Sequence, residues 1–107
     1  MNVTVGGQTY QAVFTALDMR DLGKAGVMRQ LAKFPELDAW ERLDAMAAFM
    51  AACIRRGGGT MTADDLLLVM RPEEHEPLLD AIPELMGIPK GAASPNVERP
   101  GSTATST

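Results

Sequence analysis

A long helical pattern between residues 38 and 57 constrains the fold of this chain more than any other feature. Its apolar residues recur at spacings of three and four, which place them on one face of an α-helix. They are Trp40, Leu43, Met46, Ala47, Met50, Cys53 and Ile54. Asp38 can cap the first turn, and two arginines before Gly57 complement the negative end of the helix. We therefore predict a central core helix that turns this whole stripe inward.

Two short helices are predicted before the central one. The first begins at Thr15, whose hydroxyl can accept from the free amides of the first turn. The glycines in residues 23–26 each lower helix stability by roughly 1 kcal/mol relative to Ala, so a break is expected there. Apolar residues then return at helical spacing over residues 27–34, until Pro35 imposes an extended preference on its predecessor.

Two more helices are predicted after the central one. Thr62 caps a short helix whose apolar members are Leu66, Leu67, Val69 and Met70. Residues 74–86 keep helical spacing through Leu78, Leu79, Ile82, Leu85 and Met86. Because Pro83 removes an internal hydrogen bond, we predict a kinked or two-part last helix that ends near Gly87.

The first residues indicate a β-hairpin. Residues 3–14 alternate in side-chain type around Gly6–Gly7, a pair that suits the positive φ angles of a two-residue turn. A lone hairpin is marginal in water, so we expect its apolar side chains to rest on the helices. These are Val3, Val5, Tyr10 and Phe14.

At 107 residues the chain fits one domain. We predict a mainly α (α+β) fold over residues 1–87: an N-terminal hairpin followed by a bundle of four to five short helices. Residues 88–107 contain Pro89, Pro95 and Pro100 among Gly, Ser and Thr, with almost no large apolar side chain. Such a composition is typical of a flexible, disordered tail.

Charge and cysteine content narrow the class of protein. A net charge of −4 gives no electrostatic reason to bind nucleic acid. No segment resembles a signal peptide or has the roughly 20 continuous apolar residues that cross a bilayer. The single Cys53 cannot form an internal disulfide. We expect a protein of the cytoplasm, with no membrane partner.

No set of residues converges on a reaction. Cys53 lies in the apolar stripe and is predicted to be an unreactive core residue, while His75 lies between glutamates and is predicted to be a solvated turn residue. The acidic groups at 64–65 and 73–76 each open a helix, which explains them without a substrate. Gly57–Gly59 lacks the lysine of a phosphate loop. We predict no enzyme activity, no metal and no cofactor.

The eight methionines are the most unusual part of the composition. Methionine is flexible and polarizable, so it suits a surface that receives helices of varied sequence. We hypothesise a partner-binding groove for an amphipathic helix formed by Met46, Met50, Leu66 and Met70. The alternative is that these side chains fill the core.

Several segments in order resemble the tail assembly chaperones of long-tailed bacteriophages, prophages and gene transfer agents. These segments are the hairpin at residues 3–10, the short helix from Thr15, Gly26–Leu31, the long helix that ends in residues 52–59, and Thr62–Leu66. The resemblance covers residues 1–87 as an order of elements. It implies a small, mainly helical, non-enzymatic protein of virion assembly.

In that family the protein coats the tape measure protein before the tail tube polymerises and is absent from the finished particle. A longer product of a ribosomal frameshift is thought to contact tail tube subunits. The resemblance thus implies the tape measure protein and the tail tube protein as partners, with self-association of many copies along the tape measure. Binding at many sites would then replace high affinity at each one.

The same residues leave three alternative functions open. A structural tail component would stay in the virion. A small acidic protein-binding regulator would use the turn at residues 73–76. An enzyme would need a positioned acid, base or nucleophile, which the sequence does not indicate.

Overall fold

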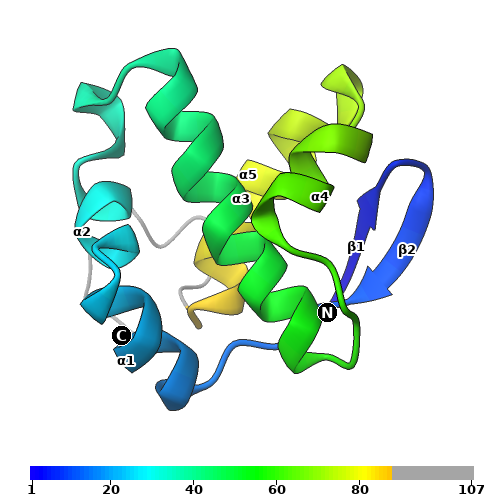
Figure 1. The fold of residues 1–107 in the computed structure, drawn as a ribbon, viewed down its shortest axis with the longest axis horizontal. Coiled ribbons are helices and arrows are strands. Elements are labelled where there is room, and N and C mark those ends of the chain that lie inside the picture. The colour runs from blue at the N-terminus through cyan, green and yellow to red at the C-terminus, as the bar shows by residue number, and fades with distance from the viewer. Residues whose placement is uncertain (88–107) are drawn as a thin grey trace, which may run out of the picture.

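The computed structural model describes residues 1–87, which form a two-stranded hairpin and five α-helices (Figure 1). In chain order the elements are β1 (Asn2–Val5), β2 (Gln8–Gln11), α1 (Ala16–Lys24), α2 (Val27–Ala32), the 3-10 turn η1 (Phe34–Glu36), α3 (Ala39–Arg56), α4 (Ala63–Val69), the 3-10 turn η2 (Pro72–Glu74) and α5 (His75–Leu85). The predicted mainly helical fold with an N-terminal hairpin is confirmed. The tail predicted at residues 88–107 lies outside the described residues.

The hairpin is antiparallel and pairs Val5 with Gln8 next to the turn. Its two turn residues, Gly6 and Gly7, have φ angles of +62° and +81°. Positive φ at both central residues is the requirement of a two-residue hairpin turn, and glycine meets it without steric cost. The inward side chains Val3 and Val5 are buried, as the alternation predicts.

Side-chain caps begin three of the helices where the sequence predicts them. Thr15 caps α1 with Asp18 in a reciprocal capping box, and an equivalent box begins α4 at Thr62. At the start of α3 the Glu41 carboxylate accepts from the Asp38 amide at 2.9 Å. The predicted break between the first two helices lies at Gly26, which has a φ of +84°. Because each cap satisfies amides that the helix leaves free, local sequence alone explains these boundaries.

Helix α3 runs through the middle of the fold, with α1 and α2 on one side and α4 on the other (Figure 1). Its buried residues begin at Ala45 and continue to Ile54. The prediction that Trp40 points into the core is wrong, because its exposed fraction is 64%. Trp40 lies in the first turn of α3, ahead of the part of the helix where burial begins.

The last helix differs in detail from its prediction. The turn η2 leads directly into α5, which continues through Pro83 to Leu85. Pro83 is exposed, so its ring does not have to fit within the core. The chain leaves the helix at Gly87, whose φ is +83°, where the sequence predicts the end.

One hydrophobic cluster unites the hairpin with the helices. Phe49 of α3 is its largest fully buried side chain, and its ring lies 5.0 Å from that of Phe14, which follows the hairpin. No helix within residues 1–87 is long and apolar enough to cross a membrane.

Candidate functional site

One face of α5 borders two apolar cavities at the surface. His75, Leu79, Ile82 and Met86 are spaced by four, three and four residues, so they form a stripe along the helix. The cavity at the start of the stripe has about 430 Å³ and is lined by Ala39, Arg42, Leu43, Met70, Pro72 and His75. The cavity at its end has about 290 Å³ and is lined by Leu31, Phe34, Leu79, Ile82, Pro83 and Met86.

Arg42 of the first cavity contacts Phe34 of the second. It lines the first one, and its guanidinium carbon lies 5.7 Å from the centre of the Phe34 ring, which lines the second. Its Nη2 donates to the Pro35 carbonyl at 2.9 Å and its Nε to the Phe34 carbonyl at 3.3 Å. We call the two cavities and this Arg42–Phe34 contact the α5 groove.

The α5 groove is apolar apart from two nitrogen-bearing side chains. Arg42 is held by the contacts just described, whereas Nε2 of His75 is buried and has no hydrogen-bond partner among residues 1–87. His75 is therefore a partly buried residue at the start of α5, and the prediction of a solvated turn residue is wrong. A buried polar atom without a partner carries a desolvation cost.

The residues predicted to form a methionine groove lie elsewhere. Met46, Met50 and Leu66 have no exposed surface and belong to the core, so the prediction that they line a groove is wrong for all three. The physical reason is domain size: a small domain needs its large apolar side chains for its own interior. Met70 is partly buried and lines the first cavity, so it belongs to the α5 groove.

Trp40 and Leu43 extend the apolar surface beside the first cavity. Residues three apart on a helix are neighbours, so Trp40 lies next to Leu43, which lines that cavity. An exposed tryptophan is a common feature of binding surfaces, since its ring provides a large contact area. The periodic pattern identified this residue but assigned it to the interior.

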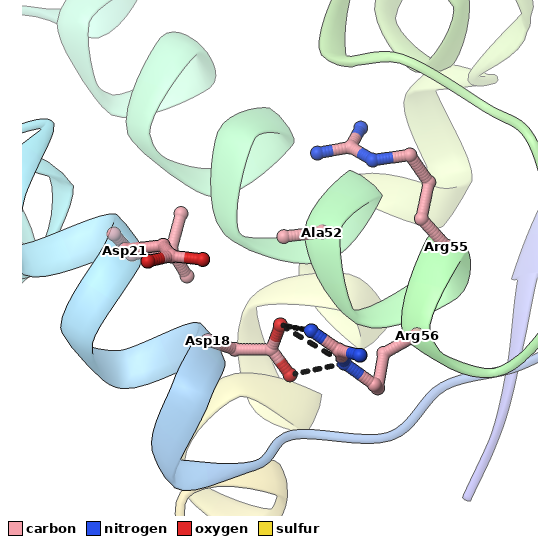
Figure 2. A pocket seen from close by; sticks show the side chains of 6 residues that line it. Asp18, Asp21, Ala52, Arg55 and Arg56 are labelled. Atoms are coloured by element: carbon pink, nitrogen blue, oxygen red, sulfur yellow. Dashed lines mark hydrogen bonds and ion pairs between the residues drawn. The ribbon is translucent and has the colours of Figure 1, made fainter.

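A third cavity, of about 490 Å³, is polar and lies between α1 and the end of α3. Figure 2 shows its charged side chains, with Asp18 pointing at Arg56. Its lining residues are Asp18, Asp21, Leu22, Ala52, Arg55 and Arg56. Arg55 donates from Nη1 to the carbonyl of Met61 at 3.0 Å, which ties the end of α3 to the following loop.

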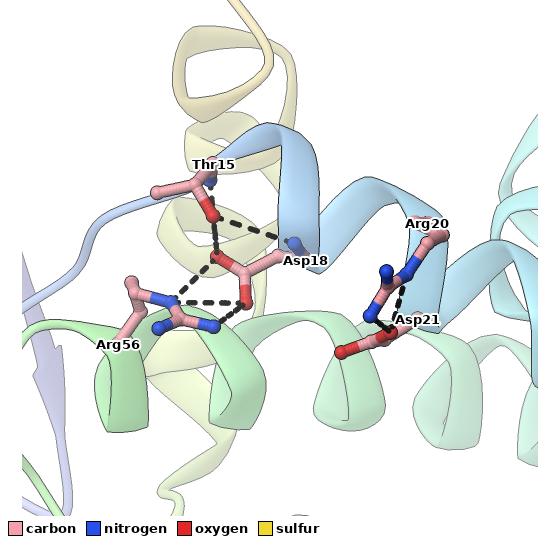
Figure 3. Close-up of polar contacts among 5 residues, drawn as sticks. All are labelled: Thr15, Asp18, Arg20, Asp21 and Arg56. Atoms are coloured by element: carbon pink, nitrogen blue, oxygen red, sulfur yellow. Dashed lines mark hydrogen bonds and ion pairs between the residues drawn. The ribbon is translucent and has the colours of Figure 1, made fainter.

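Asp18 is the centre of a network that fastens α1 to α3 (Figure 3). Arg56 donates to its two carboxylate oxygens at 3.1 and 3.2 Å, and Thr15 donates from both its amide and its hydroxyl at 3.0 and 2.9 Å. Burial alone would raise the pKa of Asp18, but the hydrogen bonds from Arg56 and Thr15 outweigh it and lower this pKa. The charges of Asp18 and Arg56 are thus satisfied by each other within the fold.

Glu74 forms a second buried polar link that the sequence did not reveal. One carboxylate oxygen accepts from the Gly6 and Arg71 amides at 2.7 and 2.9 Å, and the other accepts from the Gly7 amide at 2.8 Å. The bond from Arg71 is the main cause that lowers the pKa of Glu74; burial opposes it, and the two glycine amides add to it. The hairpin turn is thereby fixed to η2.

Cys53 is fully buried, as predicted. Burial, followed by the negative charge of Asp18, raises the pKa of its thiol to about 12. A thiol with such a pKa is protonated near neutral pH and is a poor nucleophile. Within residues 1–87, no group of three or more His, Cys, Asp or Glu side chains is arranged to hold a metal ion.

Comparison of the chain with protein-family models, with curated proteins and with solved structures finds no match.

Proposed function

We propose that this protein is a tail assembly chaperone, which binds the tape measure protein in the bacterial cytoplasm and keeps it soluble until the tail tube forms around it. The resemblance in the order of the hairpin and helices suggests the family. The observation that carries the proposal is the α5 groove, whose two apolar cavities lie along about three helical turns, at roughly 1.5 Å per residue from His75 to Met86.

A groove of this kind suits an amphipathic helix. Such a helix places its apolar face in an apolar groove and is held by anchors spaced by three, four or seven residues. The two cavities would receive those anchors, and Trp40 would cover the helix at one end. A long helix with repeated apolar positions could bind many copies of the protein side by side, with many weak contacts adding up.

Co-expression of the full chain with the tape measure protein encoded beside it tests the proposal. We expect the two to co-purify and the tape measure protein to become soluble. Met70→Lys and Met86→Lys, one in each cavity, should abolish co-purification, because each puts a charge into an apolar site. Leu68→Lys is the matched control, since Leu68 is 84% exposed and lines neither cavity.

The proposal fails if the tape measure protein stays insoluble and does not co-purify with the unmodified chain. If the two groove variants and the control bind the tape measure protein equally well, its binding site lies outside the α5 groove. Mass spectrometry of purified particles separates a chaperone, which is expected to be absent, from a structural tail component.

A further inference from the structure

The end of α5 has the geometry of a glycine cap. Gly87 has a φ of +83°, and its amide donates to the carbonyl of Glu84 at 3.1 Å. A positive φ directly after the C-cap Met86, together with this hydrogen bond, is the pattern of a Schellman motif. In that motif the residue after the glycine is frequently apolar and packs on the helix five or six positions earlier.

The positions that would receive this residue border the second cavity of the α5 groove. Pro83 and Ile82 lie five and six positions before residue 88, and both line the cavity of about 290 Å³. All of the residues that line this cavity are apolar, whereas the first cavity also has Arg42 and His75 in its wall. The second cavity therefore suits an apolar side chain that brings no polar atom with it.

The sequence supplies such a side chain at the required position. Ile88 follows Gly87 directly, and Met86, two positions earlier, lines the cavity. Consecutive Cα atoms lie about 3.8 Å apart, so no intervening loop is needed for Ile88 to reach it. Pro89 opposes continuation of the helix and favours an extended backbone at the residue before it. The other large apolar residue of the segment 88–107 is Val97, nine positions further along.

We propose that Ile88 occupies the second cavity of the α5 groove and closes it to other apolar ligands. The contact is autoinhibitory, because a helical partner that uses both cavities has to displace Ile88 before its second anchor binds. Trp40 and the first cavity stay open for the initial contact. This inference deepens the proposed function, and its effect on the tape measure protein rests on that function.

Nuclear magnetic resonance of the full chain tests the contact without any partner. Phe34 brings an aromatic ring to the wall of the second cavity. We expect nuclear Overhauser contacts between that ring and the methyl groups of Ile88. Absence of these contacts in the folded protein would overturn the inference.

Ile88→Ser and Val97→Ser form a matched pair of variants of the full chain. Each replaces a β-branched apolar residue of the segment 88–107 by a small polar one. The probe is anilinonaphthalene sulfonate, a dye that fluoresces on exposed apolar surface. Ile88→Ser should bind the dye about fivefold more tightly than the unmodified chain, the factor expected if the cavity is open in about one of five unmodified molecules.

Val97→Ser should bind the dye like the unmodified chain, and circular dichroism should show that both variants keep their helices. Equal dye binding by the two variants would overturn the inference, because the effect would then not be specific to the residue after the cap.

Co-expression with the tape measure protein separates this inference from the proposed function. With the chain at a limiting level, Ile88→Ser should co-purify more tape measure protein than the unmodified chain, and Val97→Ser the same amount. If all three co-purify equal amounts, Ile88 does not compete with the partner, so the autoinhibition is wrong and the chaperone function stands. If none co-purifies it while the Ile88–Phe34 contacts and the gain in dye binding are observed, the chaperone proposal is wrong and Ile88 closes the cavity to another apolar ligand.

Discussion

Replacement of Met50 by Ala tests whether the central methionines build the core or a binding surface. Met50 has no exposed surface, and truncation of a fully buried methionine costs about 2–5 kcal/mol through lost burial and the cavity left behind. Small domains have a total stability of about 5–15 kcal/mol. If Met50→Ala lowers the free energy of unfolding by about 3 kcal/mol, the melting temperature should fall by about 12–24 °C.

The matched substitution is Met70→Ala, in the wall of the α5 groove. Met70 is only partly buried, so its truncation should cost about 1 kcal/mol or less. Urea denaturation followed by circular dichroism gives both values, provided that the slope of the transition is unchanged. Below its melting temperature, Met50→Ala should still bind the tape measure protein, whereas Met70→Ala should bind it weakly.

The opposite ranking would refute this reasoning. If Met50→Ala loses less than about 1 kcal/mol and Met70→Ala loses more, the interior has been assigned to the wrong methionine. Loss of tape measure binding by a fully folded Met50→Ala protein would restore the hypothesis that Met50 contributes to the binding surface.

Three further predictions concern buried polar groups. Cys53 should resist alkylation near pH 8 in the folded protein and react after unfolding, as thiol labelling can measure; rapid labelling of folded protein would contradict its pKa of about 12. Glu74→Gln should speed amide hydrogen exchange at Gly6–Gly7 and leave α3 protected, whereas unchanged exchange at the turn would show that the link is dispensable. Asp18→Asn should cost about 1–2 kcal/mol at pH 7 through its weaker bonds to Arg56. Folding lowers the pKa of Asp18 from 3.8, so its contribution to stability is complete well above that pH. The contribution disappears as the pH falls through the lower pKa of the folded state. The wild-type and variant stabilities should therefore converge in acid.

Much of the fold follows from interactions within a few residues. The caps at Thr15, Asp38 and Thr62 satisfy amides of their own helices, so the starts of α1, α3 and α4 could be predicted from sequence. The hairpin turn required two positive φ angles, and Gly6–Gly7 is the pair that provides them. Each of these requirements is local and does not depend on the rest of the chain.

Burial could be predicted only in part. Helical periodicity identifies which face of α3 is apolar, but it does not say how far neighbouring elements extend along that face. It therefore assigned Met50 correctly to the apolar face and Trp40 wrongly to the interior. The same limit explains the groove: periodicity predicted that Leu79 and Met86 share a face, but the cavity that they line also depends on α2 and η1, which approach from elsewhere in the chain.

Long-range polar contacts were missed because a local explanation was already sufficient. A glutamate before a helix suits the helix dipole, so nothing in the sequence required Glu74 to bind the hairpin. Arg56 likewise suits the end of α3, and its partner Asp18 lies 38 residues away. A single sequence contains no signal that selects these partners.

The link between the hairpin turn and Glu74 has a consequence for synthesis. It joins each of the two turn glycines to a glutamate that lies 67 or 68 positions later in the chain, so the hairpin turn is synthesised well before its anchor. A nascent chain arrested before Arg71 would carry a hairpin with no anchor for its turn amides. The amides of the hairpin turn should therefore be among the last backbone groups of the domain to become protected.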